Sequence, residues 1–322
     1  MRMTFGVCLV LGVAAVASLA TGPVPWSDLD HQLLELRITR LLAGILAGAA
    51  LAVAGVLMQG LFRNPLASPS VTGVSAGAAL GVELALMGSV LIPGTLTILP
   101  VACLRPAAGF AGAAVALGCL LAVSRRRGDI TSVVLLGMVL SMLFSALGAY
   151  LLSLANDRWE LGRILVTFTL GGIDTATGRS VAVAAPLVGV ALGASWCWGR
   201  TLDVALSGER EAASLGVDTV AMMRWALVWT AVLASSAVTL GGGIGFVGLI
   251  VPNVLRAYLG PGHRRLVVMS ALGGAAFLTA ADVCARVLHP GPGEIPLGAI
   301  TSLVGAPFFI WFFTRERAAG RI

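Results

Sequence analysis

Few side chains in this 322-residue sequence could carry out chemistry, and those few are scattered. The three histidines, at positions 31, 263 and 289, lie far apart without paired carboxylates or a nucleophile motif beside them. The five cysteines have no CxxC or metal-ligand spacing and mostly lie in apolar runs, so we interpret them as small core residues. The sequence predicts no catalytic residue and no metal site.

The sequence also lacks the usual motif for nucleotide binding. No segment matches the phosphate-binding pattern GxxxxGK[ST], and the glycine cluster at 241–245 has neither the lysine nor the hydroxyl that this pattern requires. If ATP drives this protein, a partner polypeptide binds the ATP and its magnesium ion. We expect the chain itself to bind no cofactor.

The composition indicates a polytopic membrane protein. Apolar residues make up 58% of the chain and charged residues 11%, whereas soluble domains carry about 25% charged residues. Apolar runs near the length of about 20 residues that crosses a bilayer as a helix recur throughout. We expect an all-α fold, one membrane domain over 1–322, and about ten spans near 4–20, 41–61, 71–92, 106–123, 130–152, 178–198, 223–241, 244–259, 267–287 and 296–313.

The arginines indicate how the spans are oriented. All 21 basic residues are arginine, and they lie in the short gaps between apolar runs. This placement indicates that they set the orientation of the spans and do not bind nucleic acid. An N-terminus in the cytoplasm puts most of them in inside loops, so both termini are expected to be cytoplasmic. Residues 1–20 could alternatively be a cleaved signal peptide, since Ser18-Leu19-Ala20 resembles a cleavage site.

Two acidic residues fall within apolar runs, where ionisable groups are costly and usually functional. Asp282 is four residues before Arg286, so the two share a helix face and are expected to pair. Glu83 has no such partner in sequence. It could be a pathway residue, a hydrogen-bond acceptor between helices or a neutral protonated acid.

The longest polar interruption, about 199–222, predicts a short cytoplasmic helix near 207–216. Ser207 can cap it, Glu209 and Glu211 fall in its first turn, and Gly216 can end it. Such a helix could be a plain connector or a docking surface for a partner.

Other breaks mark turns and close contacts. Asn64-Pro65 predicts a turn, because proline lacks a donor and the residue before it avoids the helix. The cluster Gly241–Gly245 predicts close backbone approach between two spans. Stretches rich in glycine and alanine, at 47–50, 76–79 and 273–276, predict close helix packing, with or without an internal repeat.

Ordered blocks along nearly the whole chain resemble the iron-siderophore and vitamin B12 (FecCD-type) permease family of bacterial ATP-driven importers. They are 36–40 (LRITR), 63–69 (RNPLASP), 73–78 (GVSAGA), 206–217 (LSGE to LGV), 245–252 (GFVGLIVP), and the closing segments 281–286, 294–298 and 305–309.

This resemblance implies a type II importer permease fold in the inner membrane. The implied partners are a second permease subunit, identical or related, two cytoplasmic ATPase subunits and a periplasmic binding protein. On the outer face, the residues implied to dock the binding protein are Arg37, Arg40 and Arg286. The residues implied to couple to the ATPase are Ser207, Gly208, Glu209, Arg210, Leu215 and Gly216. The implied pathway or gate residues are Asn64, Pro65, Ser75, Ala76 and Gly245.

The chain departs from the family pattern at a few positions. Asn253 stands where the family usually has histidine, Ile38-Thr39 replaces Leu-Pro, and Ala76 replaces a polar residue. The expected cargo is a ferric siderophore, then haem, then cobalamin. A secondary transporter with Glu83 or Asp282 as coupling carboxylate is the alternative from another class.

Overall fold

The computed structural model describes residues 2–22, 24, 30–91, 101–127, 130–155, 158–206, 208–260, 262–288 and 294–318. Every regular element in this part of the chain is a helix, which confirms the all-α expectation. The longer helices are α1 (Arg2–Ala20), α2 (His31–Phe62), α3 (Val74–Leu91), α4 (Val101–Arg127), α5 (Ile130–Leu154), α7 (Gly178–Ala205), α9 (Thr219–Gly241), α10 (Val247–Leu259), α11 (His263–Val287) and α12 (Leu297–Ala318). The shorter ones are α6 (Trp159–Leu170), α8 (Glu209–Ser214), η2 (Pro69–Thr72) and η3 (Ile173–Thr175).

Ten of these helices occupy the ten segments that the sequence predicts to span the membrane. Of the helices described, eight are long and apolar enough to cross a bilayer: α1, α2, α4, α5, α7, α9, α11 and α12. Helices α3 and α10 are apolar but shorter. Helix α6, with only 12 residues, was absent from the expected spans because it is too short to cross a bilayer.

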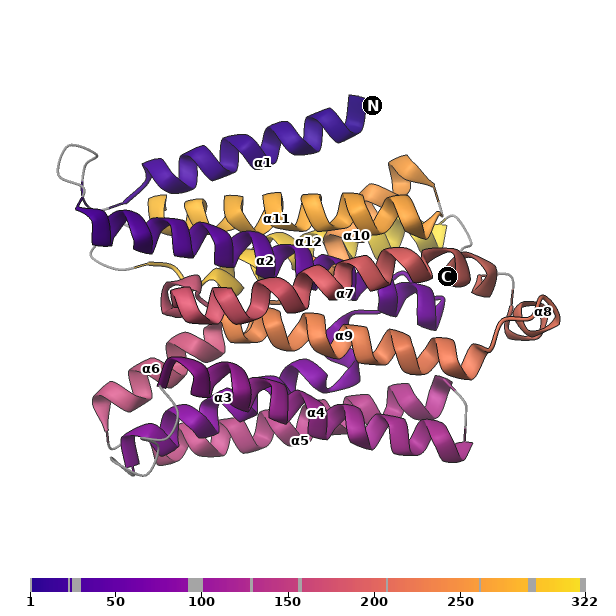
Figure 1. Ribbon diagram of the computed structural model, residues 1–322, viewed down its shortest axis with the longest axis horizontal. Coiled ribbons are helices and arrows are strands. Elements are labelled where there is room, and N and C mark those ends of the chain that lie inside the picture. The colour runs from indigo at the N-terminus through magenta and orange to yellow at the C-terminus, as the bar shows by residue number, and fades with distance from the viewer. Residues whose placement is uncertain are drawn as a thin grey trace.

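The long helices run roughly along the longest axis of the molecule (Figure 1). In this view α2, α7 and α9 lie in the middle, α1 and α11 along one edge, and α3 to α6 along the other. Helix α1 starts and α12 ends toward the end of the bundle from which α8 projects, which we call the α8 end. Helix α2 begins at the opposite end, so the chain separates its predicted docking arginines from α8 by the length of the bundle.

Helix α2 is the core of the bundle. Every residue from Ala47 to Leu61 is buried, so this helix is covered on all sides. Helices α7, α9, α10 and α11 pack around it. Two glycine pairs bring backbones into contact: Gly48 with Gly274 of α11, and Gly55 with Gly248 of α10. A β-carbon at any of these four positions would strike the facing backbone, so small residues are required here.

The cysteines correct an expectation. Cys8, Cys119, Cys197 and Cys284 are exposed on the outside of the bundle, and Cys103 is half-buried. The interpretation of the cysteines as core residues is therefore wrong. In a membrane protein, apolar residues line the outer faces of helices as well as the core, so hydropathy does not distinguish the two places.

Replacing Gly274 by leucine should destabilise the fold, because the new side chain would collide with the backbone of α2 at Gly48. Overpacking a core typically costs about 1–3 kcal/mol. We expect a lower thermal unfolding midpoint for the detergent-solubilised protein. Gly193→Leu on α7 is the matched control, since no atom lies within 4 Å of a β-carbon there. Equal midpoints for the two variants would contradict this packing argument.

Candidate functional site

An ion cluster closes the end of the bundle opposite α8. Arg40 donates from Nη2 to Asp282 Oδ1 and from Nη1 to Glu294 Oε1, each at 2.7 Å. Arg286 donates from Nη2 to Asp282 Oδ2 at 2.9 Å, which confirms the pair predicted from the i,i+4 spacing. The Asp282 side chain is only 5% exposed, so one buried carboxylate holds two arginines.

Arg286 and Arg37 also tie the end of α1 to the bundle. Arg286 Nη1 donates to the carbonyl oxygens of Ser18 at 3.0 Å and Thr21 at 2.7 Å. Arg37 Nη1 donates to the carbonyl oxygen of Leu19 at 2.8 Å. The last carbonyl groups of a helix have no hydrogen-bond donor within the helix, and these arginines supply the missing donors. The structure thus brings Arg37, Arg40 and Arg286 to one end of the bundle, where each already has partners within the chain.

Asp282→Asn should destabilise the chain, because Arg40 and Arg286 would lose their shared charge in a mostly buried setting. Removing one partner of a buried ion pair costs about 3–5 kcal/mol. We expect a clear fall in the thermal unfolding midpoint in detergent. Glu294→Gln is the control, since this carboxylate is 37% exposed and such pairs contribute about 0–1 kcal/mol. An Asp282→Asn midpoint no lower than that of the control would disprove the central role of Asp282.

Helix α8 projects from the bundle between α7 and α9 (Figure 1). It covers Glu209–Ser214, within the range 207–216 that the sequence predicts. Gly208, with a φ of 131°, is its N-cap residue. Ser207, the expected cap, lies outside the described residues, as do the side chains of Glu209 and Arg210.

The end of α8 is fixed by its backbone. Gly216, with a φ of 82°, donates its N–H to the carbonyl of Ala213 at 3.0 Å, and the N–H of Val217 donates to Ala212 at 3.0 Å. This is the Schellman arrangement, which confirms that Gly216 ends the helix. Ala212 is buried whereas Leu215 is 69% exposed, so α8 presents an apolar side chain on a fixed projection.

A cavity of about 430 Å³ lies where α3, α5, η2 and the loop between α9 and α10 meet. Ser75, Ala76 and Gly245 line it together, although they come from distant parts of the sequence. Ser68 and Ser70, beside and within η2, add hydroxyl groups to its wall. The cavity therefore offers hydrogen-bonding groups within an otherwise apolar bundle, as ligand sites commonly do.

Glu83 also lines this cavity. Its Oε1 accepts a hydrogen bond from the hydroxyl of Thr169 on α6 at 3.1 Å, and its carboxylate lies against Gly148 of α5. Glu83 is therefore a contact between helices as well as a wall of the cavity. Sequence reasoning missed Thr169 because it missed α6. A usable signal existed in the apolar residues at positions 161, 165 and 168, which recur with the helical period and are buried in the structure.

The glycine cluster makes close contacts, but not at Gly245. Gly242, with a φ of 64°, packs against the carbonyl of Phe168, and Gly243 against that of Thr169. The N–H of Gly243 donates to the Phe168 carbonyl at 3.1 Å, so the loop is bound to the end of α6. No atom lies within 4 Å of a β-carbon at Gly245. The expected close approach is thus confirmed for the cluster and wrong for Gly245, which faces open space.

Residues 63–66 form the turn that Asn64-Pro65 predicts. Arg63 adopts a left-handed conformation at the end of α2, and Asn64 Oδ1 accepts the N–H of Leu66 at 2.8 Å. Asn253 of α10 donates from Nδ2 to the carbonyl oxygens of Pro65 at 2.7 Å and Leu249 at 2.9 Å. Asn253 therefore ties the turn to α10. Neither Asn64 nor Pro65 lines the cavity at Ser75 and Gly245, but Pro65 lines another at the α8 end.

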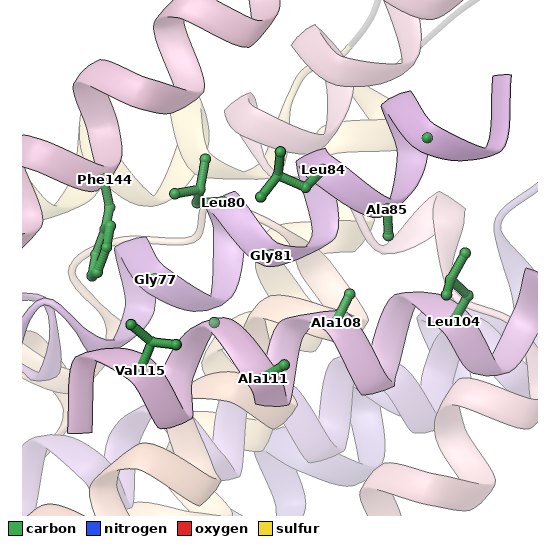
Figure 2. Close-up of a pocket in the computed structure, with 12 residues that line it drawn as sticks. Gly77, Leu80, Gly81, Leu84, Ala85, Leu104, Ala108, Ala111, Val115 and Phe144 are labelled. Carbon is green, nitrogen blue, oxygen red and sulfur yellow. The ribbon is translucent and has the colours of Figure 1, made fainter. Parts of the chain in front are cut away.

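A further cavity of about 550 Å³ lies between α3 and α4, with Phe144 of α5 at one side (Figure 2). Its walls are leucine, valine, alanine, phenylalanine and glycine residues. It lacks the convergent polar groups that orient a ligand, and none of the predicted site residues lines it. Across the described residues, no three histidine, cysteine or acidic side chains are placed to hold a metal ion.

Comparison with known proteins gives a consistent result over the whole chain. The FecCD transport family matches residues 4–315. The Fe(3+) dicitrate transport system permease protein FecD of Escherichia coli (strain K12) is 37% identical, over 97% of this chain and 98% of its own length. The cobalamin import system permease protein BtuC of Halobacterium salinarum is 38% identical, over 88% of this chain and 73% of its own.

A solved structure supports the same assignment. It shows an inward-facing conformation of a metal-chelate type ABC transporter, and it matches this structure with a TM-score of 0.85 at 28% identity. The match covers 97% of this chain and 98% of the other. Sequence and fold therefore agree.

Proposed function

The chain belongs to the FecCD transport family as a membrane permease of an ABC importer, and we propose that it moves an iron-siderophore-type chelate from periplasm to cytoplasm. The cavity shared by Ser75, Ala76 and Gly245 carries this proposal, because it joins distant segments and its largely apolar wall includes a few hydroxyl groups. Similarity to a ferric dicitrate permease over nearly the full length supports an iron chelate as cargo. Haem and cobalamin are the alternatives. The ion-coupled transporter is set aside, because the family consists of ABC importer permeases.

The arrangement of the chain supports a specific assembly. We place two ATPase subunits, which bind ATP and magnesium, at the α8 end, and the binding protein at the opposite end. These two ends are separated by the length of the bundle (Figure 1). A second permease subunit, identical or related, completes the central path. In this assembly the chain lies in the inner membrane with both termini in the cytoplasm.

Uptake by the reconstituted assembly tests the function. In liposomes that contain the permease, its ATPase subunits and its binding protein, we expect ATP-dependent entry of a radioactive ferric chelate. Gly245→Leu should reduce this uptake severalfold by filling the cavity, without lowering the unfolding midpoint, because the position has open space. Gly242→Leu should lower the midpoint as well, owing to its positive φ and its contact with Phe168. Uptake that persists without ATPase subunits would refute the function, and normal uptake by Gly245→Leu would refute the role of the cavity.

The exposed Leu215 tests the docking role of α8. Burial of a leucine side chain contributes about 1.5–3 kcal/mol, so Leu215→Asp should weaken ATPase association by about tenfold or more. The measurement is co-purification and titration of the ATPase subunits on the solubilised permease. Leu288→Asp is the control, since Leu288 is also exposed but lies at the end of α11, far from α8. Equal weakening by both changes would mean that α8 is a connector.

The docking of the binding protein by Arg37, Arg40 and Arg286 stays a proposal. Close charge pairs across a protein interface can couple by about 1.5–7 kcal/mol. Because Arg40 and Arg286 already hold Asp282, a charge reversal at Arg40 would break the ion cluster as well as any interface. Substitution of acidic residues on the binding protein therefore gives the cleaner test, since it leaves the permease intact.

A further inference from the structure

The cavity at the α8 end is lined by several arginine side chains. It has a volume of about 730 Å³ and lies between the end of α2, α10 and α12. Arg63, Arg256 and Arg315 line it, and no acidic residue among the described side chains does. Among the described side chains, none of these arginines has a carboxylate within salt-bridge distance. Three positive charges therefore line one opening, and among the described side chains none of them is paired with a carboxylate.

Two of the three arginines contact a neighbouring side chain, and in neither case is that side chain a carboxylate. Arg256 is half-buried, and its Nη1 donates to the amide oxygen Asn253 Oδ1 at 3.4 Å. The guanidinium of Arg315 lies 5.3 Å from the ring centre of Trp311. Arg63 is exposed at the left-handed end of α2. A carboxylate or similar anionic oxygen group is the partner that such guanidinium groups bind best.

Two buried polar side chains belong to the wall of the same cavity. Gln59 and His263 are at least 97% buried and line it. Gln59 Oε1 and His263 Nε2 have no hydrogen-bond partner among the described residues. His263 Nδ1 lies 2.7 Å from Asp203 Oδ1, which orients its ring. Both atoms are covered by protein, and His263 Nε2 packs against Gly60 of α2, so the arginines are the groups that this cavity offers to a ligand.

The cavity lies directly beyond the one at Ser75 and Gly245. Gly248 and Leu249 of α10 line the inner cavity, and Asn253, one helical turn further on, lines this one. Gln59 Nε2 donates to the carbonyl of Gly248 at 3.2 Å, so the two walls share a hydrogen bond. A ligand moving along α10 toward the α8 end would meet the arginines last.

We propose that this cavity is an exit site that binds the anionic oxygen groups of the cargo, so that the cargo class is a negatively charged ferric chelate of the carboxylate or catecholate type. The inference rests on the proposed function and narrows its cargo from iron chelates in general to negatively charged ones. A volume of about 730 Å³ lies within the range of about 300–1,000 Å³ that holds whole small ligands, whereas a bare phosphate would fill little of it. Cyanocobalamin, which has no net charge, gains less from the arginines than an anionic chelate does.

Direct binding tests the proposal. The wild-type permease in nanodiscs of neutral phosphatidylcholine is titrated with ferric citrate as the anionic probe and cyanocobalamin as the neutral one. We expect Arg256→Gln and Arg315→Gln each to weaken ferric citrate binding by about tenfold, and added salt to weaken wild-type binding. Arg256→Lys should restore part of the affinity. Arg265→Gln is the matched control, because Arg265 is an exposed arginine in the first turn of α11 outside the cavity.

Three results would overturn the exit site. The first is unchanged ferric citrate affinity in both glutamine variants, provided that their unfolding midpoints match the wild type. The second is equal binding of cyanocobalamin. The third is loss of ferric citrate binding when only a few phosphatidylglycerol molecules per permease are added, too few to give the bilayer a strong negative surface potential, which would assign the cavity to a lipid headgroup. Uptake separates this inference from the proposed function: import of cobalamin and of no ferric chelate would refute the function itself.

Discussion

Helix α2 can lie at the centre of this bundle because its glycines let neighbouring backbones touch it. Lipid tails are as apolar as leucine side chains, so the hydrophobic effect does not drive helices together within a membrane. Helix association there depends on close packing and on hydrogen bonds between helices. Gly48 against Gly274 and Gly55 against Gly248 provide that packing over about two turns of α2. These contacts set where α10 and α11 lie, and the functional groups on both helices follow from that placement.

From this arrangement the two ends of the bundle acquire different chemistry. Asp282, carried by α11, meets Arg40 of α2 at one end, and the result is a cluster in which opposite charges are paired. At the other end, α10 brings Arg256 beside Arg63 and Arg315, and no carboxylate in the part of the chain that the structure describes lines the space between them. Between the ends, Glu83, Gln59 and Asn253 make the polar contacts that hold the cavity walls together.

The sequence predicted the parts of this structure that depend on local spacing. Hydropathy located the ten longer helices, and the i,i+4 relation located the Asp282–Arg286 pair. The contact of Arg40 with Asp282 joins residues 242 positions apart, so no local sequence pattern predicts it. The same holds for the distinction between Gly242, which touches α6, and Gly245, which faces a cavity. The burial of side chains could not be predicted from the sequence either, because cysteines on outer helix faces have the same apolar sequence neighbours as cysteines in a core.

The hydrogen bond from Asn253 to the Pro65 carbonyl has a consequence for the conditions under which the protein works. An imidazole at this position would change its charge near pH 6.5, and its hydrogen-bond donors would change with it. A carboxamide has no such transition and keeps the same donor from acid to alkali. The link between the 63–66 turn and α10 therefore keeps its donor when the pH falls, because the side chain that makes it cannot take up a proton in that range.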